Sequence, residues 1–175
     1  MKATGIVRRI DELGRIVIPK EIRRVLRIRE GDPIEIYTDE DGIVLKKYAR
    51  IRELGDYADT YCQALNGALG LSAAVTDTET VRFAAGPLKK RLMNAKLSEG
   101  LIERMRSRKT LLSPEGFQAF DDDSPALRLA AVPIIQSGDV MGSVLLITDE
   151  ARLRLSETEL SILKTAALYL GKELE

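Results

Sequence analysis

The first fifty residues place the tightest limit on what this chain can fold into. Their pattern predicts two strands, at 6–10 and 15–18, then a short helix that begins at Pro19, and a hairpin over 34–48. A module of this length buries too little surface to be stable alone, and it contains no cysteine. It is nevertheless rich in isoleucine and valine. We therefore expect an obligate dimer in which strands of two chains share one core.

Turn and cap residues set the boundaries of these elements. Gly14 ends the turn between the first two strands, and proline at position 19 suits the first position of a helix, where no N–H is needed. The strand at 15–18 is β-branched on both sides, so we expect both of its faces to be buried. Asp41-Gly42 is a strong signal for a hairpin turn.

The formal net charge of zero, from 27 basic and 27 acidic residues, conceals an asymmetry. Up to position 29 the chain has nine basic residues and only three acidic ones: Lys2, Arg8, Arg9, Arg15, Lys20, Arg23, Arg24, Arg27 and Arg29 against Asp11, Glu12 and Glu21. Arginine provides a planar fork of donors that matches phosphate oxygens. A solvated surface is the alternative interpretation. The spread of the excess over two strands and a helix favours nucleic acid as partner.

The same segment resembles a known family. GIVRRIDELGRIVIPKEIRRVLRIREGDPIEIY, followed by GIVLKKY, is similar to the AbrB-type swapped-hairpin DNA-binding domain of bacterial transition-state regulators. The resemblance implies two chains that exchange hairpins to form one β-barrel-like dimer on double-stranded DNA. It also implies that the residues in contact with DNA are Arg8, Arg15, Arg23 and Arg24. We add Arg9 and Lys20 to this set. In such a dimer, shape and phosphate contacts outweigh a base code.

Composition removes several classes of function. The chain has no histidine and one cysteine, Cys62, so the usual general base and the usual zinc ligand sets are missing. We expect Cys62 to be a buried apolar residue on a helix, and we expect no cofactor, no metal and no membrane partner. The start of the chain has no signal-peptide core, and no apolar run reaches the length of a membrane span. These features predict a cytoplasmic, nucleoid-associated protein.

The rest of the chain predicts a second, larger domain, with boundaries at 1–50 and 53–175. Helices alternate with hairpins, and Ser156 with Glu159 forms a capping box at the start of the last helix. The expected elements are a helix at 51–69, strands at 71–77 and 80–85, helices at 88–94 and 98–108, a polar loop at 113–124, strands at 127–136 and 140–148, and a helix from Ser156. The fold class is α+β, with a mainly antiparallel sheet flanked by helices.

This order of elements, together with the hairpin PIIQSGDVMGSVLLIT, resembles a GAF domain, a small-molecule sensor fold. The resemblance implies a possible effector, with its pocket between the sheet and the loop that carries Phe117 and Phe120. The signature of cyclic-nucleotide-binding members is absent. The first helix of this domain carries a short apolar seam of coiled-coil type, and the apolar stripe of the last helix is wider than its own sheet needs. These two features predict a homotetramer; a well-buried amphipathic last helix is the alternative.

Other classes of function remain open from the sequence. Asp121, Asp122 and Asp123, with Asp77, are candidates for a metal site, although a run of acids is more typical of a solvated loop. The run 89–91 could hold an anion, but no catalytic constellation accompanies it. A second hypothesis is an antitoxin-like DNA-binding protein, whose tail binds a protein partner. The patterned strands beyond residue 70 favour a folded domain and hence a transcription regulator.

Overall fold

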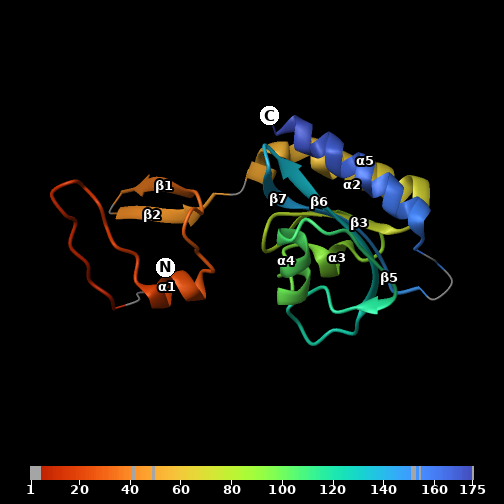
Figure 1. Ribbon diagram of the computed structural model, residues 1–175, viewed down its shortest axis with the longest axis horizontal. Helices are drawn as coiled ribbons and strands as arrows, with labels where there is room; N and C mark the ends of the chain where they lie inside the picture. The colour runs from red at the N-terminus through yellow and green to blue at the C-terminus, as the bar shows by residue number, and fades with distance from the viewer. Residues whose placement is uncertain (1–4, 41, 49, 151–152, 154, 175) are drawn as a thin grey trace. The chain divides into compact units, whose positions relative to one another are not determined.

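The computed structural model contains two compact units, residues 1–48 and residues 49–175, and each is described by itself (Figure 1). The structure describes residues 5–40, 42–48, 50–150, 153 and 155–174.

The first unit contains one helix and one hairpin. The helix α1 spans Lys20–Val25, with Pro19 at its N-cap rather than inside its first turn. Strands β1, Ile34–Asp39, and β2, Gly42–Lys47, pair antiparallel, as predicted. Asp39 is paired with Gly42, so two residues form the turn, of which residue 41 lies outside the described part.

The two strands expected at 6–10 and 15–18 are not formed in the single chain. The turn between them is present: the Asp11 carboxylate accepts the backbone N–H groups of Leu13 (3.0 Å) and Arg15 (2.8 Å). On either side of it, Val7 is 84% and Val17 is 73% exposed, so one chain alone does not provide the burial that we expect for 15–18 in a dimer. A strand needs a neighbouring strand, and in one chain neither of these segments belongs to a sheet.

The second unit begins with a 3₁₀ helix, η1, at Arg50–Leu54, and is built around a five-stranded antiparallel sheet of order β4-β3-β7-β6-β5. Its helices are α2 (Gly55–Leu69), α3 (Lys89–Leu92), α4 (Glu99–Arg106) and α5 (Glu157–Glu173). Its strands are β3 (Ser72–Thr76), β4 (Val81–Ala85), β5 (Leu111–Phe117), β6 (Leu127–Gln136) and β7 (Asp139–Thr148).

Helices cover both faces of this sheet. Figure 1 shows α2 and α5 side by side on one face, while α3 and α4 lie on the other. Each face has its own apolar core. The core under α2 and α5 includes Ile51, Val144 and Leu163, all fully buried. The core under α3 and α4 includes Leu97 and Ile147, also fully buried. The sheet is therefore the middle layer of three.

Predicted capping residues are found at the ends of several of these helices. Gly70 forms the C-cap of α2, and the Ser98 side chain accepts the Leu101 N–H at the start of α4. The capping box of Ser156 and Glu159 is formed at the start of α5. Inside the sheet, a Cβ on Gly142 would lie 1.8 Å from the carbonyl oxygen of Thr76, so only glycine fits at this position of β7 beside β3.

The polar loop expected at 113–124 is wrong over its first half, which belongs to the edge strand β5. An edge strand with one solvated side shows little apolar alternation, and Pro114 and Gly116 further disguise it. Phe120 is 3% exposed within the core under α3 and α4. Phe117 is partly buried and packs against the same core, so the effector pocket expected beside these two rings stays a prediction.

Candidate nucleic-acid interface

All six predicted DNA-contacting residues are exposed in the single chain. Arg8 and Arg9 lie in the segment before the first turn, and Arg15 directly follows that turn. The other three, Lys20, Arg23 and Arg24, belong to α1. The guanidinium groups on α1 lie in its last turn, where positive charge also favours the helix dipole. The surface of this unit is thus rich in phosphate-compatible donors.

Arg15 is held by a local ion pair. Its Nε lies 2.7 Å from Oδ2 of Asp11, and both side chains remain well exposed to solvent. The backbone N–H of Arg15, followed by its side chain, lowers the pKa of Asp11 below the ordinary value of 3.8. Asp11 is therefore ionised at neutral pH, and it orients the arginine at the turn without shielding it from a ligand.

The same unit also exposes apolar side chains. On α1, Val25 is 80% exposed. On the hairpin, Ile36 is 67% and Ile43 is 66% exposed. β1 pairs Ile36 with Leu45, so apolar residues of both strands share one face of the hairpin. Uncovered apolar surface of this extent on so small a unit indicates that it is not a monomer.

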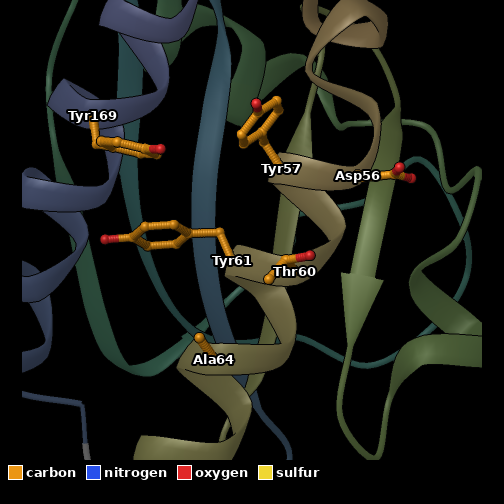
Figure 2. Close-up of a pocket in the computed structure, with 6 residues that line it drawn as sticks. All are labelled: Asp56, Tyr57, Thr60, Tyr61, Ala64 and Tyr169. Atoms are coloured by element: carbon orange, nitrogen blue, oxygen red, sulfur yellow. The ribbon is translucent and has the colours of Figure 1, made fainter.

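A second candidate site lies on the outer surface of α2 and α5, and sequence reasoning had not singled it out. Three of the chain's five tyrosines line a hollow of about 480 Å³ there (Figure 2). We call it the tyrosine groove; its residues are Asp56, Tyr57, Thr60, Tyr61, Ala64 and Tyr169. The only signal in the sequence was the placement of Tyr61 and Tyr169 in the apolar stripes of the two helices.

The rings in the tyrosine groove are partly ordered against one another. Tyr61 and Tyr169 stack, with ring centroids 5.7 Å apart and an angle of 23° between their planes. Loss of solvent around the phenol, and then the charge of Glu173, raise the pKa of Tyr169. Tyr57 is 60% exposed and Tyr169 is 40% exposed, which leaves apolar ring surface open at the groove. Stacked tyrosines of this kind are typical of protein interfaces.

The residues considered for catalysis or metal binding, Cys62 and the aspartates, do not form a common site in the described part of the chain. Cys62 is fully buried, and burial, followed by the charge of Asp59, raises the pKa of its thiol to about 12. Asp122 instead accepts the N–H and hydroxyl of Ser124 in a surface turn, while Asp77 pairs with Arg82. Among the residues that the structure describes, no cluster of three potential metal ligands occurs. No helix in those same ranges is long and apolar enough to cross a bilayer.

The run 89–91 also has a local explanation. Lys89 and Lys90 are exposed on the one-turn helix α3, and Arg91 donates a hydrogen bond to the carbonyl of Pro125 at 3.3 Å. This arginine therefore ties α3 to the loop before β6.

The sequence profiles of two families match the chain. The profile described as "Stage V sporulation protein T C-terminal, transcription factor" covers residues 53–175. The profile described as "Antidote-toxin recognition MazE, bacterial antitoxin" covers residues 7–53. An exposed arginine-rich unit joined to a three-layer domain thus defines a two-domain transcription factor.

Two relatives from Bacillus subtilis (strain 168) agree with this class. Stage V sporulation protein T is 42% identical over 181 aligned residues, which cover 100% of this chain and 99% of that protein. The transition state regulatory protein AbrB is 49% identical over 75 residues, or 41% of this chain and 78% of that protein. The chain therefore belongs to the stage V sporulation protein T family of transcription factors.

A solved structure supports the fold of the second unit. The cofactor-binding GAF domain of the nutrient sensor CodY from Clostridium difficile superposes with a TM-score of 0.53. It is 18% identical in sequence, and the match covers 67% of this chain and 83% of that domain. At this level of identity the likeness concerns the fold alone, and the predicted GAF-like architecture is confirmed.

Proposed function

We propose that this protein regulates transcription by binding double-stranded DNA through the arginine-rich surface of a dimer formed by its first unit. The DNA contacts are Arg8, Arg9, Arg15, Lys20, Arg23 and Arg24, and they bind the phosphate backbone more than base edges. The observation that carries this proposal is the combination of six exposed basic residues with exposed apolar side chains in the same small unit. Pairing would cover the apolar residues and double the set of cations across a two-fold axis. Such a regulator would act in the cytoplasm, at the nucleoid.

We further propose that the second unit, residues 53–175, assembles these dimers into tetramers through the tyrosine groove. The groove lies on the face of α2 and α5 that points away from the sheet, and Leu168 beside it is 69% exposed. The GAF-like fold also suits control by a small-molecule effector. An effector bound on the side of α3 and α4 would meet the apolar side chains of that core. A metabolite that shifts the melting temperature and the DNA affinity together would identify one.

The match of residues 7–53 to an antitoxin profile supports a second candidate, in which the chain also neutralises a toxin. Antitoxin tails are expected to be short and poorly ordered, whereas residues beyond 53 form a packed three-layer domain here. A toxin-like protein that co-purifies with the full chain would favour this candidate over the first.

The first test is DNA binding by the full chain and by single alanine variants of the arginines. If phosphates dominate, log affinity falls with log salt concentration with a slope of about −0.9 for each neutralised phosphate. Arg8→Ala, Arg23→Ala and Arg24→Ala should each weaken binding and reduce the slope by about two, because a dimer carries each arginine twice, with the melting temperature unchanged. Arg106→Ala, in the second unit, is the charge-matched control. Parent-like binding by every variant would contradict the assignment.

A further inference from the structure

The boundary between the two units is anchored on both sides. In the first unit, the backbone N–H of Tyr48 donates to the carbonyl of Pro33 at 3.0 Å. In the second, Arg50 begins η1, and the next residue, Ile51, is fully buried. A single residue, number 49, separates these two anchored positions. The connection is therefore much shorter than a flexible linker of ordinary length.

Arg50 joins three segments of the second unit. One terminal nitrogen of its guanidinium donates to Oε1 of Gln136 at 2.7 Å, and the other donates to the carbonyl of Leu174 at 2.5 Å. Gln136 is the last residue of β6 and is 9% exposed, while Leu174 is the C-cap of α5. The planar fork of arginine can reach both acceptors at once, which a lysine ammonium does less well.

The groups that Arg50 holds are themselves closely packed. A Cβ on Gly171 of α5 would lie 2.6 Å from the carbonyl oxygen of Ile135, so helix and strand touch one residue before Gln136. Leu174 is also buried, at 3% exposure. The carbonyl of Leu174 lies in the last turn of α5, where helical carbonyls lack intrahelical partners and carry partial negative charge. A cation is the expected partner at that position.

The two helices of the tyrosine groove both lead to this junction. α2 follows η1 directly at Gly55, and α5 carries Tyr169 one and a half turns before Leu174. We infer that Arg50 is a positioning residue: its fork fixes the point at which the chain leaves the second unit, so that assembly at the helix pair sets the spacing of the DNA-binding dimers. This inference rests on the proposed function and specifies how the two units act together.

The consequence is a higher affinity for DNA that is long enough to bind two dimers at once. Two DNA-binding dimers held at a fixed spacing engage one long duplex with a high effective concentration, and slack in the connection lowers it. A duplex of about 20 base pairs, two helical turns, offers room for one dimer. A duplex of about 100 base pairs, shorter than one persistence length, offers room for two and remains stiff.

The test compares the affinity of full-length variants for these two duplexes. Arg50→Ala should lower the ratio of long-duplex to short-duplex affinity by about fivefold or more, within the range of typical coupling between sites. Binding to the short duplex and the sedimentation mass should stay those of the parent. Gln136→Ala should act in the same direction, and Arg50→Lys should lie between the parent and Arg50→Ala. Arg52→Ala removes the same charge from an exposed position of η1 and should behave as the parent.

Each alternative outcome has a definite meaning. If Arg50→Ala, Arg50→Lys and Gln136→Ala all keep the parent's ratio, or lower only the melting temperature, the positioning role is overturned. Equal affinity of the parent for both duplexes overturns it as well, and leaves DNA binding itself intact. A parent that binds neither duplex overturns the proposed function, and this inference with it.

Discussion

Residue type decides what the arginine-rich surface can do. The pair of Arg15 and Asp11 is solvent-exposed, and exposed ion pairs add little to stability, so its effect is to orient the guanidinium. Arginine keeps its charge at any physiological pH and can fork onto a phosphate in place of the carboxylate. The exposed cations are therefore suited to a ligand and contribute little to the fold.

Single glycines give the sharpest stability prediction at this scale. Gly142→Ala places a methyl group against the backbone at Thr76, so we expect a loss of about 1–3 kcal/mol or more in the free energy of unfolding. Gly67 lies inside α2 with no atom near its missing Cβ. Gly67→Ala should therefore stabilise the protein by about 0.5–1 kcal/mol. Chemical denaturation of both variants provides the measurement, and a neutral Gly142→Ala would contradict the close approach.

At the scale of elements, helix α5 of the second unit begins with a complete capping box. Ser156 N–H donates to Oε2 of Glu159 at 2.8 Å, and the N–H of Thr158 donates back to the Ser156 hydroxyl at 3.2 Å. These contacts satisfy backbone donors that the first turn of a helix leaves open. The apolar residues of α5 then pack against the sheet.

Removal of this cap should have a pH-dependent cost. Ser156→Ala should lower the free energy of unfolding by about 1 kcal/mol at neutral pH. The hydrogen bond from Ser156 lowers the pKa of Glu159 below its ordinary value of 4.5, so this contribution is present above that pH and is lost as the carboxylate is protonated. The difference between variant and parent should shrink below pH 4.5. Ser161→Ala, within the same helix, is the control and should cost nothing.

At the scale of the whole molecule, two different surfaces are incomplete in one chain. The first unit exposes apolar residues that a second copy would cover, and the tyrosine groove does the same on the second unit. Two such interfaces on each chain are what the proposed tetramer requires. The stability of the first unit then depends on protein concentration.

Assembly can be tested by a change at the tyrosine groove. Tyr169→Glu removes the ring that stacks on Tyr61 and adds a charge, so the full chain should sediment as a dimer instead of a tetramer. Short DNA duplexes should still bind, because the first unit is untouched. Lys164→Glu lies on another side of α5, five residues away, and should leave the mass unchanged. A Tyr169→Glu variant that stays tetrameric would place the second interface elsewhere.

Much of the fold was predictable from local pattern. The hairpin of β1 and β2, the strand at 127–136 and the capping box at Ser156 depend on alternation, turn residues and cap residues, which are neighbours in the chain. The six exposed cations were also predictable, because charged side chains stay in water wherever the chain folds. For all of these, the information is local in sequence.

Only the tertiary structure decided the rest. β5 has the composition of a loop and is a strand because β6 offers it backbone partners. The segments 6–10 and 15–18 have the composition of strands and form none in one chain, where neither belongs to a sheet. The tyrosine groove and the fork of Arg50 join residues more than eighty positions apart, and no local pattern reports such distances. Local sequence thus determined which segments can form strands and helices, whereas the availability of partners in space decided which ones did.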